Sequence, residues 1–242
     1  MGSSAALSPL LARPDIWRGD QFASAPLPVL PSGFADLDAA LPGGGWPRGA
    51  LTEILLDGAG IGEISLLLPA LQAQRESGGW TLLVAPPFPL HGPAWAGCGI
   101  DLARLVVVSP ARADQALWAA EQALASGAPG AVMAWLPQAD ARAVRRLQVA
   151  AANSAAAAFV FRPEKARAEA SAAPLRIRMS ALAEGDLELE LLKRRGPPLA
   201  LPLRLAPLRP IMGVSRGKHD AFVAGPGAAA RPQFHAIQSV PA

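Results

Sequence analysis

The chain has 242 residues, of which 51% are hydrophobic and 17% are charged, and its length fits one domain of about 200 residues plus tails. No apolar run reaches the roughly 20 residues that span a bilayer, and the N-terminus has no basic region followed by an apolar segment, so we expect a cytoplasmic protein with no membrane contact. Cys98 is the single cysteine, which excludes an internal disulfide and a cysteine-clustered metal site.

The first predicted element is an N-terminal arm, residues 1–28, with an apolar patch that includes Trp17. We expect part of this arm to dock, either on its own domain or on a partner. From Gly49 onward, short apolar runs alternate with segments of helical spacing. The runs predict strands over residues 50–56, 80–85, 105–108, 131–136 and 158–161, and the other segments predict helices over residues 63–76, 114–125 and 140–153, the last with Asp140 as its N-terminal cap.

Strands that alternate with helices predict an α/β fold with a mostly parallel sheet and helices on both faces. After residue 174 the pattern changes to period-two alternation, in "LRIRMSAL" and "DLELELLKRRGPPLALPLRL", which predicts antiparallel strands that extend one edge of the sheet. We therefore assign the domain to residues 29–209. Residues 210–242 are rich in proline, glycine and alanine, and we expect a largely disordered tail.

A glycine cluster follows the first long strand, in "EILLDGAGIGEISLLLPALQ". Strand, glycine loop and helix form the layout of a phosphate-binding loop, in which glycines turn backbone N–H groups toward an anion. Gly58, Gly60 and Gly62 supply that backbone. Glu63 and Ile64 stand where such a loop has lysine and serine or threonine, so the sequence predicts either a vestigial nucleotide loop or an ordinary strand-to-helix turn.

The chain resembles RecA-type recombinases over about residues 29–205. The resemblance rests on "LPSGFADLDAALPGGGWPRGALTEI", "CGIDLARLVVVSPARADQALWAAEQAL" and "ELLKRRGPPLALPL", in this order. It implies a RecA-like core built around a phosphate-binding loop. It also implies positions for a catalytic carboxylate and a magnesium-associated aspartate, which Pro87 and Trp135 occupy here. We therefore expect a protein without ATPase activity, catalytic residues or a cofactor; an active DNA-dependent ATPase is the alternative.

Two further segments, "RPDIWRGDQF" and "AWLPQADARAVRRLQVAA", resemble a narrower family, ImuA, the RecA-like accessory protein of mutagenic translesion synthesis. This resemblance implies three partners: an ImuB-type polymerase homologue, an error-prone replicative-type polymerase, and RecA itself as a filament. SulA, an inhibitor of the tubulin-like division protein, is a shorter relative with similar motifs. A SulA-like inhibitor is therefore the alternative function.

Three basic groups are candidates for contact with partners or DNA. Arg142, Arg145 and Arg146 share one face of a predicted helix, which suits DNA, an acidic partner or plain solvation, while Val144 and Leu147 are expected to face the core. Lys193 and Arg195 match two RecA lysines that reach the ATP of a neighbouring subunit, or they mark the end of a hairpin. The loop "RPEKARAEASAAP" resembles a DNA-binding loop of RecA but has no aromatic residue, so we expect either a solvated loop or at most weak DNA binding. The three histidines lack metal-ligand spacing.

Overall fold

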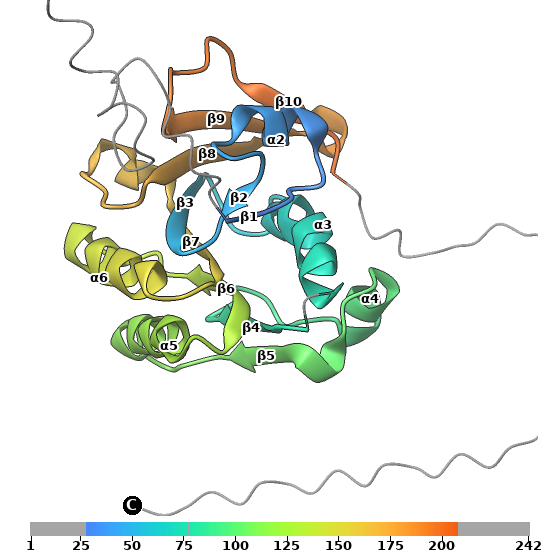
Figure 1. Ribbon diagram of the computed structural model, residues 1–242, viewed down its shortest axis with the longest axis vertical. Helices are drawn as coiled ribbons and strands as arrows, with labels where there is room; N and C mark the ends of the chain where they lie inside the picture. The colour runs from blue at the N-terminus through green and yellow to red at the C-terminus, as the bar shows by residue number, and fades with distance from the viewer. Residues whose placement is uncertain (1–27, 77, 208–242) are drawn as a thin grey trace, which may run out of the picture. The chain divides into compact units, whose positions relative to one another are not determined.

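An eight-stranded sheet organises the residues that the structure, a computed structural model, describes: 28–76 and 78–207 (Figure 1). The predicted arm with Trp17, and the predicted tail, lie outside these residues. The order across the sheet is β10-β9-β8-β3-β7-β6-β4-β5. The strands are β3 (Ala50–Leu56), β4 (Trp80–Val84), β5 (Leu105–Val108), β6 (Pro129–Trp135), β7 (Ala157–Pro163), β8 (Leu175–Ala181), β9 (Leu187–Lys193) and β10 (Leu203–Leu205).

The sheet is parallel from β8 to β5 and antiparallel at its other edge, where β9 pairs with β8 and β10 pairs with β9. The predicted α/β class and the antiparallel extension are thus confirmed. One detail of the prediction is wrong: β8, the first strand after residue 174, still lies parallel to β3. Whether a strand pairs parallel or antiparallel with its neighbour depends on the connection that leads into it. The period-two pattern within the strand does not specify that connection.

Helices cover both faces of the sheet (Figure 1). One face is packed by α3 (Glu63–Glu76) and α4 (Gly92–Gly97), and the other by α5 (Ala113–Ser126) and α6 (Ala141–Ala152). The carboxylate of Asp140 accepts the backbone N–H of Ala143 at 2.7 Å, which confirms the predicted cap of α6. Short elements complete the described chain: β1 (Val29–Leu30), α2 (Ala35–Ala40), β2 (Trp46–Pro47), η1 (Leu102–Arg104), η2 (Glu164–Ala168) and η3 (Ala183–Gly185).

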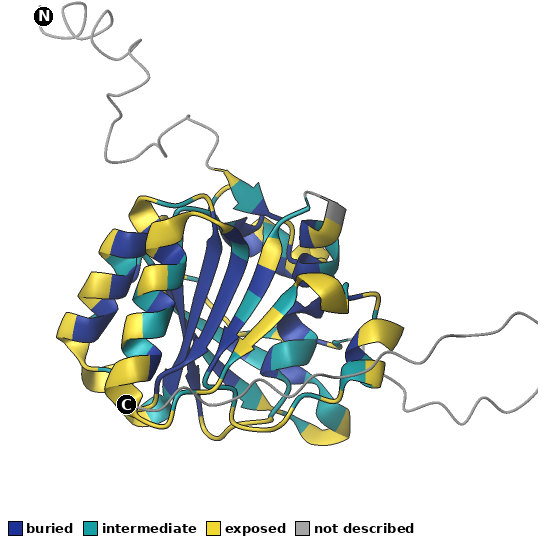
Figure 2. Ribbon diagram, turned by 90° about the horizontal axis from the view of Figure 1, so that it is seen from below, coloured by how far each residue is buried: buried dark blue, intermediate teal, exposed yellow. Residues whose placement is uncertain are grey.

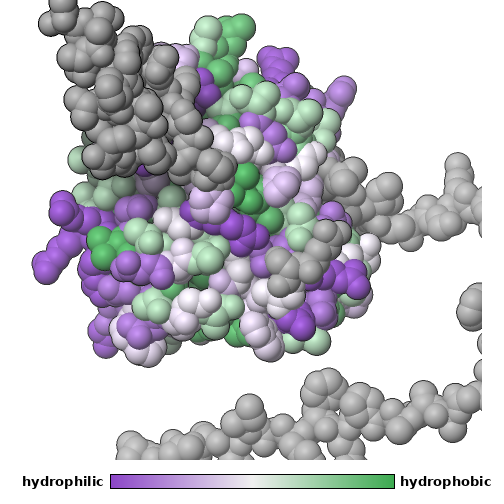
Figure 3. Space-filling model, viewed as in Figure 1, coloured by the Kyte–Doolittle hydropathy of each residue, from purple (hydrophilic) through white to green (hydrophobic). Residues whose placement is uncertain are grey.

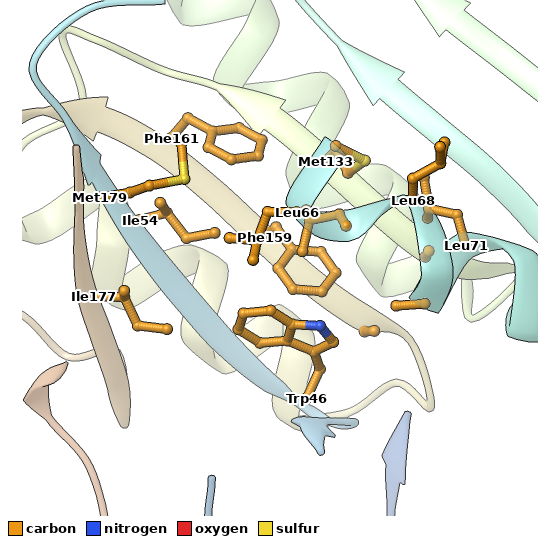
Figure 4. Packing of buried hydrophobic residues seen from close by; sticks show 14 of the residues in the cluster. Trp46, Ile54, Leu66, Leu68, Leu71, Met133, Phe159, Phe161, Ile177 and Met179 are labelled. Atoms are coloured by element: carbon orange, nitrogen blue, oxygen red, sulfur yellow. The ribbon is translucent and has the colours of Figure 1, made fainter. Parts of the chain in front are cut away.

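The main core lies between the sheet and α3. Trp46 meets Phe159 edge to face, with ring centroids 5.4 Å apart, and aliphatic side chains of α3 and β3 surround the pair (Figure 4). Central strands are buried on both faces, whereas the helices expose their outer sides (Figure 2). This burial explains why the central strands have continuous apolar runs rather than alternation.

Candidate functional site

The glycine loop, residues 57–62, joins β3 to α3 as the phosphate-loop layout requires. Gly60 and Gly62 have φ angles of +79° and +119°, in the region that favours glycine. A Cβ on Gly60 would lie 2.8 Å from the ring of Phe88, and one on Gly62 would lie 3.0 Å from Leu187. Both the backbone conformation and the close packing at these two positions therefore favour glycine.

The first residue of α3, Glu63, turns its side chain back into this loop. Its Oε1 accepts the backbone N–H of Gly60 at 2.9 Å, and its Oε2 accepts the N–H of Gly62 at 3.2 Å. The residue is 2% exposed. N–H groups at the start of a helix favour a negative charge, and here that charge belongs to the chain itself. A phosphate could use these two donors only by displacing the carboxylate.

Trp135 lies at the carboxyl end of β6, where the RecA resemblance places an aspartate. Its indole Nε1 donates to Oε1 of Glu63 at 3.4 Å, and its ring stacks on Phe161 with centroids 4.6 Å apart. The structure thus brings together two of the four substituted positions in one direct contact. An aspartate at position 135 would instead place a second carboxylate beside Glu63, which like-charge repulsion disfavours.

The other two substituted positions lie beside the same loop. A pocket of about 220 Å³ contains Ile64 and Pro87 in its lining, together with Ser65 and Phe88. Small-molecule pockets usually measure about 300–1,000 Å³, so this space is small for a nucleotide. Ile64 also packs against the main core, which accounts for an apolar residue at that position.

A second pocket, of about 820 Å³, opens at the carboxyl ends of the parallel strands. Its lining combines the glycine loop, the start of α5, the turn after β6 and η2, with polar groups at Asp57, Arg112, Asp114, Gln138 and Lys165. Arg112 donates to the carboxylate of Asp114 at 3.0 and 2.9 Å, and these hydrogen bonds lower the pKa of Asp114 below its ordinary value. The crevice at this edge of an open parallel sheet is the usual position of a ligand site.

A buried ion network lies under the loop that follows β7. Glu53 of β3 is fully buried, and its two carboxylate oxygens each bind one arginine of a neighbouring strand at 2.6 Å, Arg162 of β7 and Arg176 of β8. Arg162 also binds Glu169 at 2.6 Å and the carbonyl of Ala139. This network was not predicted from the sequence, because no spacing rule connects residues on three strands so distant in the chain.

The network corrects one interpretation of the sequence. The segment from Arg162 to residue 174 matched a DNA-binding loop, but Arg162 belongs to β7 and is only 3% exposed. Burial lowers the pKa of its guanidinium, but the bonds to Glu169 and Glu53 outweigh this effect, and the net shift is upward. Arg167 binds Glu190 at 2.7 Å, which leaves Lys165 as the one cation of this segment with no ion-pair partner among the described residues.

The three arginines of α6 are all exposed, and their apolar neighbours Val144 and Leu147 are buried, as predicted. Arg146 forms an ion pair with Glu121 of α5, with 3.3 Å between Nε and Oε1. Arg142 and Arg145 have no ion-pair partner in the described part of the chain. The predicted shared face is thus present, but one of its three charges is already used by a neighbouring helix.

Lys193 ends β9, and Arg195 lies in the connection to β10, which confirms their place on the late hairpin. Both are exposed. The ammonium of Lys193 donates to the carbonyl of Ser171 at 2.9 Å, so it is held beside the loop before β8. Among residues 28–76 and 78–207, no contact joins Lys193 or Arg195 to Glu63.

Metal sites and membrane-spanning helices are absent from the part of the chain that the structure describes. No cluster of three or more histidine, cysteine, aspartate or glutamate residues there is arranged to hold a metal ion. Within the same residues, no helix combines the length and the apolar character needed to cross a membrane.

Comparison with known proteins places these features in context. The family model described as "Cell division inhibitor SulA" matches residues 49–158, from the start of β3 into β7. RecA proteins of Francisella tularensis are 34% identical over 109 residues, in subsp. novicida strain U112, subsp. tularensis strain SCHU S4 and subsp. holarctica strain LVS. The match covers 45% of the chain and 30% of each relative, so the chain spans about a third of the length of these relatives. Part of the chain is thus similar to SulA and RecA, and its sheet is consistent with a RecA-like core.

Proposed function

We propose that this chain is a non-catalytic, RecA-like accessory protein of the damage-induced SOS response that serves mutagenic translesion synthesis. Its partners in this proposal are an ImuB-type polymerase homologue, an error-prone replicative-type polymerase and a RecA filament. It acts through protein–protein contacts, and its contribution to the polymerases is to position them. The relation to RecA and SulA supports the damage-response setting.

The observation that carries the proposal is the position of the Glu63 carboxylate. It accepts the loop N–H groups of Gly60 and Gly62, which a triphosphate would otherwise use. A carboxylate a few ångströms from a triphosphate costs on the order of kcal/mol even when heavily screened. Pro87 and Trp135, which have no carboxylate to activate water or to associate with magnesium, line the same pocket and stand where the RecA resemblance implies those two groups.

An ATPase assay tests the non-catalytic part of the proposal. Purified protein is incubated with ATP and magnesium, with and without single-stranded DNA, and inorganic phosphate is measured. We expect no release above a buffer control under either condition. A matched preparation carrying Glu63→Ala guards against contaminants, because only turnover that changes with this substitution belongs to the glycine loop. Such turnover in the parent protein would refute the proposal.

Affinity capture after DNA damage tests the partner part. The tagged chain is recovered from damaged and undamaged cells of its own organism, and co-purified proteins are identified by mass spectrometry. We expect polymerase-related proteins to be enriched after damage. Capture of the division protein in their place would favour the second candidate.

That second candidate is a SulA-like inhibitor of the tubulin-like division protein. It is favoured by the family match over residues 49–158, which contains the glycine loop, α5 and α6. The described chain continues past this match through β8, β9 and β10, which supports the accessory role over the inhibitor. Light scattering of the purified division protein with GTP separates the two, since an inhibitor suppresses polymer formation at near-stoichiometric amounts and an accessory protein leaves it unchanged.

A further inference from the structure

The outer surface of the α5–α6 pair exposes large apolar side chains. Trp118 of α5 is 61% exposed and Val149 of α6 is 57% exposed. The opposite sides of both helices pack into a separate apolar cluster beneath the sheet, with Ala120 and Leu147 among its members. The exposed residues are therefore not part of the core, and a tryptophan left this open on a rigid helix is a candidate anchor for a partner.

The ion pair between Glu121 and Arg146 joins the two helices through their side chains. Both helices connect parallel strands of one sheet, so they run in the same direction. Trp118 precedes Glu121 by three residues and Arg142 precedes Arg146 by four, which are axial steps of about 4.5 and 6 Å in the same direction. Counted from this ion pair, Trp118 and Arg142 therefore each lie about one helical turn toward the N-terminus of their own helix.

The charge on this surface is positive. Glu121 is neutralised by Arg146, whereas Arg142 and Arg145 have no ion-pair partner among the described residues. In Figure 3, hydrophilic side chains protrude at the edge of the molecule where Figure 1 draws α6, and a hydrophobic patch lies beside them. Figure 2 shows the same two helices with their exposed sides turned away from the sheet.

The chemistry favours a protein over a nucleic acid as the occupant. Two free arginines are few for a phosphate backbone, and the carboxylate of Glu121 lies in the middle of the surface. Val149 offers apolar contact that phosphates cannot use. A groove between two helices accepts the side-chain ridge of a third helix. A third helix with one apolar stripe can cover Trp118 and Val149 while flanking acids reach Arg142 and Arg145.

We propose that the α5–α6 face is a docking site for an acidic amphipathic helix of a partner protein. This inference rests on the proposed function, because it supplies the chemistry of one of the protein contacts through which the chain acts. In the complex, Trp118 enters the apolar stripe of the bound helix. Arg142 and Arg145 pair with its carboxylates, which fixes the orientation of the helix on the groove.

A displayed library of helical peptides of about 18 residues, or five helical turns, with randomised surface positions, tests the proposal. The library is selected on the full-length chain and counter-selected on the full-length triple variant Trp118→Ala, Arg142→Glu, Arg145→Glu. We expect enrichment of peptides with apolar residues at i, i+3, i+4 and i+7 flanked by aspartate or glutamate. The proposal would be overturned if the enriched peptides lacked acidic residues. It would also be overturned if no peptide bound the parent chain in preference to the triple variant.

One enriched peptide is then measured in solution by fluorescence anisotropy. We expect Trp118→Ala and the double variant Arg142→Glu, Arg145→Glu each to weaken binding by about tenfold, the equivalent of 1.4 kcal/mol. Replacing the peptide acids with lysine should restore binding to the double charge-reversed variant. Two variants elsewhere on the surface are the matched controls and should bind like the parent. Phe88→Ala removes an aromatic side chain that is 58% exposed, and Arg75→Glu with Arg204→Glu reverses two exposed charges.

The competing probe is a single-stranded oligonucleotide with the same net charge as the peptide. If it binds the parent more tightly than the peptide does and loses affinity with the same variants, the face is a nucleic-acid surface and the proposal is wrong. Neither result alters the ATPase or affinity-capture experiments, so failure here is distinguishable from failure of the proposed function. Circular dichroism of each variant confirms that the fold is retained.

Discussion

The indole Nε1 of Trp135 donates to Oε1 of Glu63 at 3.4 Å, across a separation of 72 residues. Each of these residues replaces a polar group that the RecA resemblance assigns to nucleotide chemistry. Their contact shows that the two replacements are structurally compatible, since the indole supplies a donor to the carboxylate that occupies the loop. The glycine loop is thus a packed internal motif as well as a strand-to-helix turn.

Loss of the Glu63 carboxylate should destabilise the fold. Glu63→Ala leaves the N–H groups of Gly60 and Gly62 without their partner, and we expect a loss of about 1–3 kcal/mol in the free energy of unfolding. Glu63→Gln retains one acceptor oxygen and should cost less. Urea unfolding followed by circular dichroism gives the values. Asp57→Ala, in an exposed position of the same loop, is the control, and an equal effect of both alanine variants would contradict this role of Glu63.

Removal of the Glu53 charge should have a larger effect. Glu53→Gln leaves Arg162 and Arg176 buried with one carboxylate fewer, and breaking a buried ion pair from one side costs about 3–5 kcal/mol. The matched control is Glu169→Gln, which also contacts Arg162 but has a side chain that is 46% exposed. Its effect should be much smaller, since water can replace the lost charge. Thermal and urea unfolding of both variants measure the two losses in the free energy of unfolding.

Binding to single-stranded DNA should be weak and salt-sensitive. Arg142 and Arg145 are the cations of α6 without an ion-pair partner among the described residues, and each phosphate contact adds about −0.7 to the slope of log K against log salt. Reversal of Arg142, Arg145 and Arg146 to glutamate should remove what binding there is. Anisotropy of a labelled oligonucleotide over a salt series measures this. Tight binding that persists at high salt would indicate a base-stacking surface elsewhere.

Association with RecA filaments should depend on the late hairpin. If Lys193 and Arg195 reach phosphates of a neighbouring ATP, each charged contact contributes about 1.5–3 kcal/mol. Lys193→Glu with Arg195→Glu should therefore weaken binding to ATP-bound filaments by about tenfold or more. Lys193 must first leave the carbonyl of Ser171, so its contribution should lie at the low end. Arg204→Glu on β10 serves as control, and equal affinity of the double variant and the parent would exclude this contact.

Local patterns in the sequence were sufficient for most of the fold. The helix from Glu63 to Glu76 was predicted with the bounds that the structure gives, because a glycine loop precedes it and a buried strand sets its direction. The cap at Asp140 was also predicted correctly, since capping uses only residues within one turn. The short β1–β2 pair was missed because a two-residue strand has no periodicity to detect.

The candidate site was predictable in its composition and not in its contacts. The sequence shows directly that Glu63 replaces the phosphate-loop lysine. The hydrogen bond between its carboxylate and the N–H of Gly60 depends on a backbone turn, which residue spacing does not specify. Arg162 was assigned to a loop because the segment that it begins resembles a DNA-binding loop of RecA. Its burial becomes intelligible only with Glu53, which is 109 residues away and lies on the neighbouring strand β3.

A covalently attached anion differs from a bound nucleotide in one physical respect: it is present at a constant local concentration. Loops that hold a diffusible triphosphate change their environment as the ligand arrives, is cleaved and leaves. The carboxylate of Glu63 is tethered one residue from Gly62 and has no such cycle. While this contact persists, the charge inside the glycine loop does not depend on the ratio of ATP to ADP. Under the proposed non-catalytic role, we expect the timing of this protein's action to come from its synthesis, its degradation or its partners.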